Sequence, residues 1–267
     1  MKLENYELHL PSYSVGKEVY NQIGKICKQY GTKVLVIGGK KALSAAFDKI
    51  SKNAADGGLD IIGKEIYGTD CTYEAVERLA ALTSFQEADM VFAVGGGKAI
   101  DTCKCLCIEC EKPVFTFPTI ASNCAACTSV SIMYHEDGTF FKPHFFTHPA
   151  AHAFIDTQII AAAPYRYLWA GIGDTYAKNY EAEISSRGEK LPHYTEVGVG
   201  FSKMCLTPML EYGRQALEDN KKGVATEALE QVALAIVVTT AIVSIFLTRD
   251  FTPDYNSGLA HACFYAL

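Results

Sequence analysis

The sequence predicts an α/β fold: a Rossmann-like N-terminal domain with a mostly parallel sheet, followed by an all-helical domain. Short apolar runs that end in glycines, such as 33–39 and 89–97, alternate with helical periodicity through the first half of the chain. These runs are apolar throughout, as in parallel strands that helices cover on both faces. From about Pro164 only helical patterns remain. We therefore expect one domain at 1–160 and another at 161–267.

The elements of the first half follow from local patterns. Four runs rich in β-branched and aromatic residues predict strands, at 33–39, 60–68, 89–97 and 113–119. Helical periodicity separates them, at 42–58, 72–86 and 99–111. Thr72 has the residue type of a helix N-cap. A hairpin is expected at 129–141, with Asp137 and Gly138 at its turn.

The second half contains the patterns of four helices. Three are expected at 163–187, 196–223 and 226–249, and another begins after the loop 250–258. Within the third, residues 232–247 are almost wholly apolar, but the run is shorter than the ~20 residues that span a membrane. We therefore expect a buried central helix and no contact with a membrane.

Charge and composition exclude some classes of function. The net charge of -6 and the isoelectric point of about 5.7 argue against a nucleic-acid partner. Residues 1–13 contain no apolar segment of the signal-peptide type, so we expect a cytoplasmic protein. The ten cysteines are expected to be reduced. Cys103, Cys107 and Cys110 would share a helical face, but a structural zinc site needs paired ligands, and we favour buried thiols.

The segment "VGGGKAID" (94–101) joins an expected strand to an expected helix. Its glycines let a ligand approach the backbone, and the free N–H groups of a helix start attract anions. The spacing matches neither G-x-G-x-x-G nor the Walker pattern. We favour a diphosphate-binding loop over a plain tight turn, because the segment follows an apolar strand.

A second polar loop follows the next expected strand. Residues 117–134 include the hydroxyls of Thr119, Ser122 and Thr128. At the carboxyl edge of an open α/β sheet, such side chains can contact a ligand. They can equally satisfy their own backbone, and the residues alone leave both interpretations open.

Asp174 and His261 are the candidate metal ligands. Each lies among small residues, in "AGIGDTYAK" and "SGLAHA", and each would come from its own helix. Alone, Asp174 would be interpreted as a solvated aspartate and His261 as a packed core histidine. Together, facing the same edge of the sheet, they indicate a metal site.

A competing histidine set consists of His144, His148 and His152, which have helical spacing. Pro143 and Pro149 exclude a continuous helix there. We therefore expect these histidines to be loop residues without a metal.

Five segments occur in one order along the chain: "KVLVIGGKKAL", "VGGGKAIDTCK", "FPTIASNCAACTSVSIMY", "IDTQIIAAAPYRYLWAGIGDTYAK" and "SGLAHA". Together they resemble the glycerol dehydrogenase group of the iron-containing alcohol dehydrogenases, and the resemblance extends over essentially the whole chain. Dehydroquinate synthases and glycerol-1-phosphate dehydrogenases share the architecture, but "TSVSIMY" is more similar to glycerol dehydrogenases.

The resemblance implies a dehydroquinate-synthase-like architecture and an enzyme that transfers hydride between NAD(P) and a small alcohol or polyol. The cofactor would lie in the cleft between the domains, with its diphosphate at Gly96, Gly97 and Lys98. The implied cofactor residues are Gly39, Lys40, Gly95, Gly96, Gly97, Lys98, Asp101, Thr119, Ser122, Thr128, Val130 and Tyr134.

The resemblance also implies a divalent metal, zinc more often than iron in this group. Asp174 and His261 would be two of its three protein ligands and would act in catalysis through it. Such a metal polarises the alcohol oxygen, while the nicotinamide takes up the hydride. The implied partners are a small alcohol or ketone and further copies of the chain in a homo-oligomer.

Three departures from the family pattern bear on function. The third ligand in the family is a histidine further on, in a helical region that this chain lacks, so we expect an incomplete helical domain. Cys124 stands where the family often has an aspartate that binds glycerol, so it belongs to the substrate site while glycerol itself is in doubt. Gly39 replaces an aspartate of NAD-preferring relatives, and with Lys40 and Lys41 beside it NADP(H) is a second candidate cofactor.

Other functions stay open alongside the dehydrogenase. A dehydroquinate-synthase-like lyase would need a basic cluster for a phosphate substrate, and segment 119–180 offers none beyond Lys142, Arg166 and Lys178. A glycerol-1-phosphate dehydrogenase-like enzyme is a further alternative. The last is an inactive nucleotide-binding homologue, because two protein ligands leave much of a metal's coordination shell to water.

Overall fold

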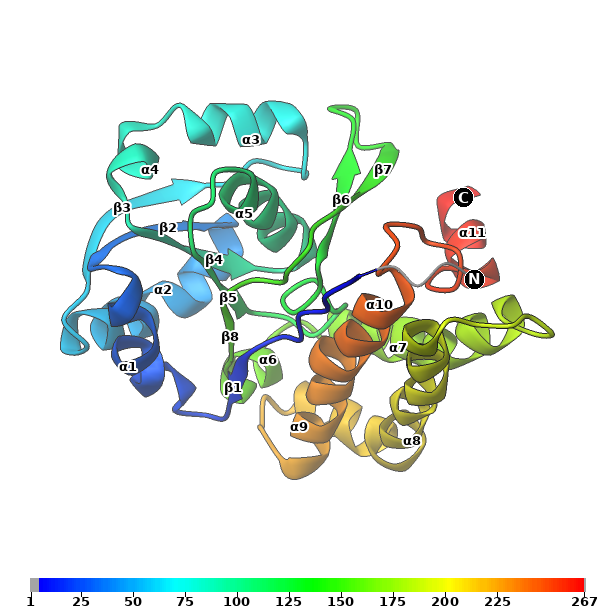
Figure 1. The fold of residues 1–267 in the computed structure, drawn as a ribbon. Coiled ribbons are helices and arrows are strands. Elements are labelled where there is room, and N and C mark those ends of the chain that lie inside the picture. Colours follow the sequence, from blue (N-terminus) through cyan, green and yellow to red (C-terminus); the bar gives the residue numbers. More distant parts are fainter. Residues whose placement is uncertain (1–4, 267) are drawn as a thin grey trace.

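A six-stranded parallel sheet is the centre of the N-terminal half (Figure 1). The computed structural model describes residues 5–266, with side chains through 263. The strand order is β1-β8-β5-β4-β2-β3, and every neighbouring pair is parallel. These strands are β1 (Tyr13–Val15), β2 (Lys33–Gly38), β3 (Asp60–Ile66), β4 (Met90–Gly95), β5 (Val114–Pro118) and β8 (His152–Ile155). The predicted α/β class with a mostly parallel sheet is confirmed.

The central strands are apolar on both faces because a separate core lies on each side of the sheet. In β2, Val34 and Val36 belong to one core, while Leu35 and Ile37 belong to the other. This alternation is the two-residue period of a strand. Continuous apolar runs therefore predicted these strands correctly.

Helices cover both faces (Figure 1). On one face lies α2 (Lys40–Asp56), which buries Leu43 and Ile50 against β2 and β4, together with α1 (Ile23–Cys27). On the other lies α5 (Gly97–Glu109), with α3 (Tyr73–Ala80) and α4 (Thr83–Glu87). Residues 72–86 were expected to form one helix, but the backbone of Leu82 is extended (φ -71°, ψ 133°) and divides it. The predicted N-cap is confirmed, because the Thr72 side chain accepts a hydrogen bond from Ala75 N at 3.1 Å.

The predicted hairpin consists of β6 (Val130–Tyr134) and β7 (Phe140–Phe145), paired antiparallel. Gly138 at its turn has φ +83°, a conformation that favours glycine, as the Asp-Gly signal indicates. Prediction of His144 and His152 as loop residues was wrong, because His144 lies in β7 and His152 in β8. Pro143 is tolerated in β7 because that strand is paired on one side only.

Several short elements carry no clear sequence signal. They are β1, β8, α1 with its flanking 3-10 turns (Val19–Gln22 and Lys28–Tyr30), and α6 (Thr157–Ala161). Each has five residues or fewer, too few to establish a period of two or of 3.6. The prediction therefore lacked the two strands at one side of the sheet.

The second half is helical, as predicted. Its helices are α7 (Tyr165–Ser185), α8 (His193–Lys221), α9 (Glu227–Leu234), α10 (Thr240–Leu247) and α11 (Leu259–Ala266). A π turn, Ala235–Thr239, joins α9 to α10, and the Thr240 hydroxyl donates to the Ala235 carbonyl at 2.9 Å across it. The combined segment Glu227–Leu247 is long and apolar enough to span a membrane, yet 67% of its most apolar window is buried inside the protein. The expected central buried helix is confirmed.

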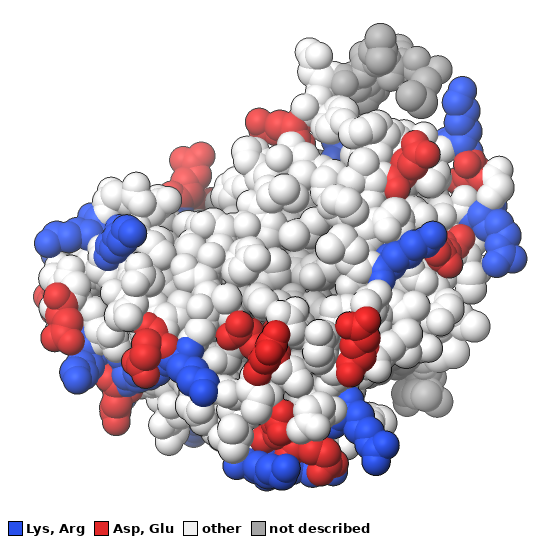
Figure 2. Space-filling view, turned by 90° about the horizontal axis from the view of Figure 1, so that it is seen from below, with Lys and Arg blue, Asp and Glu red and all other residues white. Residues whose placement is uncertain are grey.

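The surface shown in Figure 2 mixes both signs of charge. Seen from below, acidic and basic side chains are interspersed around a broad uncharged centre. No continuous basic area lies on this face among the described residues.

His152 is a buried titratable group at the pairing of β8 with β1. Its Nδ1 lies 2.7 Å from Ser12 Oγ, and its Nε2 lies 2.9 Å from Ser14 Oγ. Burial lowers the pKa of His152 from 6.5 to about 4. The folded chain therefore keeps this imidazole neutral at pH values where the unfolded chain protonates it.

We expect this histidine to make the protein sensitive to mild acid. Between pH 6.5 and about 4, His152 is protonated in the unfolded state but stays neutral in the folded state. The folded state therefore loses stability as the pH falls through this window. A His152→Gln variant should lose about 2–3 kcal/mol less than the wild type over that range. Urea unfolding at several pH values measures the difference, and parallel pH profiles would contradict it.

Candidate cofactor and metal site

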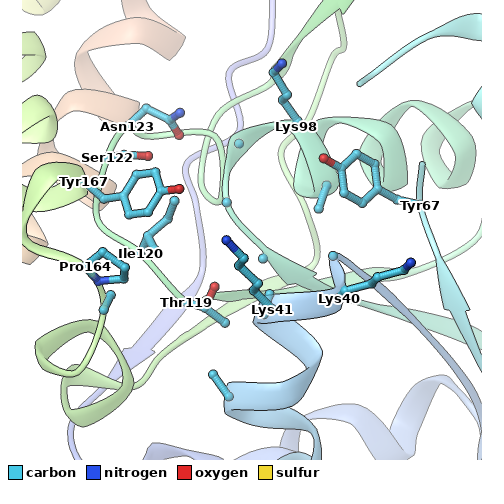
Figure 3. Close-up of a pocket in the computed structure, with 18 of the residues that line it drawn as sticks. Lys40, Lys41, Tyr67, Lys98, Thr119, Ile120, Ser122, Asn123, Pro164 and Tyr167 are labelled. Carbon is cyan, nitrogen blue, oxygen red and sulfur yellow. The ribbon is translucent and has the colours of Figure 1, made fainter. Parts of the chain in front are cut away.

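The carboxyl ends of β2, β4 and β5 open onto a cavity of about 1200 Å³ (Figure 3). The chain runs outward from β2 to β3 in one direction and from β4 to β5 in the other. Open α/β sheets bind ligands at such a reversal of strand order. Loops after β2 and β4 form one side of the cavity, and the segment from α6 to the start of α7 forms the other.

Glycines at the start of α5 allow the loop after β4 to contact the loop after β5. A Cβ at Gly96 would lie 2.6 Å from Ile120 Cδ1, and one at Gly97 would lie 2.6 Å from Asn123 Nδ2. Gly95 has φ +155°, which side-chain-bearing residues rarely adopt. No side chain caps the helix at Gly96, so its first N–H groups are available to an anion. The prediction of a ligand-approach loop at 94–101 agrees with this geometry.

Among the charged side chains that line the cavity, cationic ones outnumber the single acidic one, Asp101; the cationic residues are Lys40, Lys41, Lys49, Lys98 and Arg166. Some already have partners: Lys98 pairs with Asp70, and Lys49 lies 2.8 Å from Asp156. Lys41 points into the cavity (Figure 3). Within residues 5–266, neither Lys40 nor Lys41 has an acidic partner at ion-pair distance. An anionic ligand would therefore meet an electropositive entrance.

Ten of the twelve residues expected around the cofactor line this cavity: Gly39, Lys40, Gly95, Gly96, Gly97, Lys98, Asp101, Thr119, Ser122 and Tyr134. The other two, Thr128 and Val130, lie behind the lining. Thr128 Oγ1 is 3.1 Å from Lys104 Nζ, which also donates to the Val130 carbonyl at 2.5 Å.

Lys104 and Asp101 form a buried ion pair beneath the cavity. Lys104 Nζ lies 3.0 Å from Asp101 Oδ1, and the lysine is fully buried. Asp101 Oδ2 accepts a hydrogen bond from Ile132 N at 3.2 Å. Burial raises the pKa of Asp101, and the positive charge of Lys104 works against that rise. The pair therefore ties α5 to β6, and Asp101 has a structural partner besides any cofactor.

Other lining residues were missed because they come from distant parts of the chain. They include Tyr67, Thr69, Gln158, Pro164, Arg166 and Tyr167. Asn123 was also missed, although it follows Ser122 in the expected polar loop. A hydrogen bond from Arg166 is the main cause of a lowered pKa at Tyr167. Only tertiary packing brings the start of α7 to the sheet edge, and no local sequence pattern predicts this contact.

Asp174 on α7 and His261 on α11 meet, as predicted. His261 Nε2 lies 3.6 Å from Asp174 Oδ1. Two donors of one tetrahedral zinc, each ~2.1 Å from the ion, lie ~3.4 Å apart. The pair therefore fits two positions of such a shell. Among the described residues no group of three histidine, cysteine, aspartate or glutamate side chains could hold a metal.

Glu181, two turns along α7 from Asp174, was missed. Its Oε2 lies 2.8 Å from His261 Nδ1, and its Oε1 accepts from His261 N at 3.2 Å. Burial opposes its ionisation, but the hydrogen bonds and charge of His261 outweigh burial and lower the pKa of Glu181 to about 2. The seven-residue spacing in "DTYAKNYE" places both carboxylates on one helix face, which was the available signal.

Cys124 lies at the end of the cavity loop. Burial, and next the negative charge of Asp174, raise the pKa of Cys124 to about 12. The thiol is therefore neutral near Asp174, and a neutral thiol accepts hydrogen bonds weakly. Of the cysteines that share a helical face, Cys103 and Cys107 are buried and Cys110 is exposed.

The sequence pattern of a known family covers more than half of the chain. Residues 11–156 match the iron-containing alcohol dehydrogenases. The chain belongs to the iron-containing alcohol dehydrogenase family. Within this family, the predicted similarity to the glycerol dehydrogenase group is confirmed by the relatives below.

Two curated relatives and one crystal structure illustrate the similarity. A glycerol dehydrogenase of Escherichia coli O6:H1 is 32% identical over 224 residues, 82% of this chain and 61% of that protein. One from Thermotoga maritima is 36% identical over 179 residues, 65% of this chain and 49% of that protein. The glycerol dehydrogenase structure from Schizosaccharomyces pombe has a TM-score of 0.80 at 25% identity, covering 98% of this chain and 66% of that one. This family member thus spans about half to two thirds of the length of these relatives.

Removal of the buried lysine should destabilise this family member. Lys104→Met leaves the Asp101 carboxylate buried without its cation, which we expect to cost about 3–5 kcal/mol of unfolding free energy. The double variant Asp101→Asn, Lys104→Met removes both charges and should recover part of the loss. Urea unfolding of the two variants tests this, and a Lys104→Met protein as stable as the wild type would contradict the structural role.

Proposed function

We propose that the chain forms the cofactor site and part of the metal site of an NAD(P)-dependent dehydrogenase acting on a small alcohol or polyol. One observation carries the proposal: the cavity loop packs directly on the metal-ligand helix. A Cβ at Gly171, one turn before Asp174, would lie 2.3 Å from the Ala121 carbonyl oxygen. Hydride transfer requires cofactor and substrate in contact, so their sites must adjoin.

The cofactor would lie along the glycine-lined cavity. Its diphosphate would contact the α5 start at Gly96, Gly97 and Lys98, where N–H groups are free. The hydroxyls of Thr119 and Ser122 would contact the rest of the molecule. Thr128 and Val130 lie behind the cavity lining. They would act on the cofactor site indirectly, because their oxygen atoms accept hydrogen bonds from Lys104. Division into domains at 1–160 and 161–267 would place the cofactor at their junction.

The metal would be bound by the oxygen of Asp174 and the nitrogen of His261, a donor pair that suits zinc. When bound, it would polarise the substrate's hydroxyl oxygen, while the nicotinamide would take up the hydride. The residues of this chain position both groups. The proposal includes assembly into a homo-oligomer and a location in the cytoplasm.

The substrate proposed is a small hydroxyketone or aldehyde in the reductive direction. The neutral thiol of Cys124 is a poor acceptor for the hydroxyls of a diol, which makes glycerol a weaker candidate. Relatives with other names support a variable substrate, since a protein from Halobacterium salinarum that is 28% identical is called a glycolaldehyde reductase.

Hydride transfer can be tested directly. The zinc-loaded chain should oxidise NADH or NADPH when glycolaldehyde or hydroxyacetone is added, seen as a fall in absorbance. Asp174→Ala should reduce the rate about a hundredfold or more, because a ligand of the polarising ion is lost. If metal and cofactor both bind and no carbonyl is reduced, the proposed activity is refuted.

Cofactor preference can be tested at the loop after β2. A Cβ at Gly39 would meet Tyr67 Cε1 at 3.5 Å, an ordinary contact, so Gly39→Asp adds a carboxylate without strain. Facing a 2′-phosphate, it should weaken NADPH binding about tenfold, or ~1.4 kcal/mol, with little effect on NADH. Gly39→Asn is the neutral control of equal size. Fluorescence titration measures both affinities, and equal losses with both cofactors would contradict a 2′-phosphate position here.

A further inference from the structure

The ring of His261 is held from one side by Glu181, while its other side faces Asp174. Glu181 Oε2 lies 2.8 Å from Nδ1, and Asp174 Oδ1 lies 3.6 Å from Nε2. The two carboxylates therefore contact different nitrogens of one imidazole. Nδ1 is engaged at hydrogen-bond distance, whereas Nε2 lies beyond hydrogen-bond distance from Asp174.

A carboxylate without a proton only accepts hydrogen bonds. The contact at 2.8 Å therefore requires a proton on His261 Nδ1. In the neutral imidazole the second nitrogen then carries a lone pair. That lone pair lies on the side of Asp174.

The position of Glu181 is itself constrained. Its side chain is 5% exposed, and its second oxygen accepts the His261 backbone N–H at 3.2 Å, near the start of α11. A Cβ at Gly258 would lie 3.1 Å from Glu181 Cγ, so the chain before α11 packs closely on it. Lys178, one turn earlier on α7, donates to Asn256 in the same loop. The carboxylate therefore cannot turn away from the ring without loss of these contacts.

We propose that Glu181 is a positioning residue that fixes the Nδ1–H tautomer of His261 and so presents Nε2 to the metal. The inference rests on the proposed function for the metal, but the tautomer belongs to this chain whether or not a metal is bound. Outer carboxylates of this kind orient ligating histidines and raise their basicity. Glu181 would not touch the substrate or the metal.

The tautomer can be measured in metal-free protein. In the 15N-histidine-labelled chain at about pH 9, where ordinary imidazoles are neutral, two-bond 1H–15N correlations identify which nitrogen carries the proton. His261→Gln assigns the signal by its loss. We expect the proton on Nδ1 in the wild type. A proton on Nε2 in the wild type would overturn the inference without any variant.

Two variants extend the test to metal binding. Glu181→Gln retains the size and one acceptor oxygen but can also donate, so the ring is no longer forced into one tautomer. We expect a mixed tautomer and a zinc dissociation constant raised about 10–100-fold in chelator competition with Zn²⁺ alone. The matched control is Glu183→Gln, a glutamate of the same helix that faces Lys203, which should change zinc affinity by less than about twofold.

The outcomes separate this inference from the proposed activity. Unchanged tautomer and unchanged zinc affinity in Glu181→Gln would overturn the positioning role. A mixed tautomer with weakened zinc binding, in a chain that reduces no carbonyl, would support the positioning role and refute the dehydrogenase. Amide exchange of residues 259–266 reports whether α11 stays packed on α7 in Glu181→Gln. If α11 detaches in this variant, the tautomer measured in the wild-type protein decides whether the inference holds.

Discussion

The loop at 119–124 lies between two helices, in contact with glycines on both sides. Gly96 and Gly97, at the start of α5, face Ile120 and Asn123, and Gly171 of α7 faces the carbonyl of Ala121, in each case closer than a Cβ would allow. This backbone approach joins the sheet to the helical half. It also sets the spacing between the cavity and the carboxylates of α7, because the same loop lines the first and ends beside the second.

The cavity and the Asp174–His261 region have electrostatic environments of opposite sign. Toward the sheet edge, lysines and an arginine surround free N–H groups at a helix start, which suits an anion. Toward α11, two carboxylates of α7 face one histidine, which suits a cation. Beneath the cavity the Lys104–Asp101 pair is internally neutral and holds the hairpin strand against α5. A dinucleotide would thus bind in a positively charged region and a metal in a negatively charged one, on either side of the 119–124 loop.

Sequence patterns were sufficient to predict an element where the segment was long enough for a strand or helix period to repeat. Strands with two buried faces, such as β2 and β4, and the long helices α7 and α8 were predicted from apolar runs and helical spacing. The short elements β1, β8, α1 and α6 were missed, and the 72–86 segment was predicted as one helix because no residue type marks the extended backbone at Leu82. Ten of the twelve cofactor residues assigned from the family motifs line the cavity. The motifs could not separate these from Thr128, whose hydroxyl contacts the buried Lys104.

The sequence by itself determined the alternation of strands and helices and the glycine positions, because these depend on residue type and spacing. It also named Asp174 and His261 as a pair, through their small-residue contexts and the family motifs, but their contact at 3.6 Å comes from packing. Only the tertiary structure decided which side chains complete the sites. Arg166 and Tyr167 reach the cavity because α7 starts at the sheet edge. Glu181 reaches His261 because the loop before α11 returns to α7. Contacts between residues 80 positions apart arise from packing, and no local pattern encodes them.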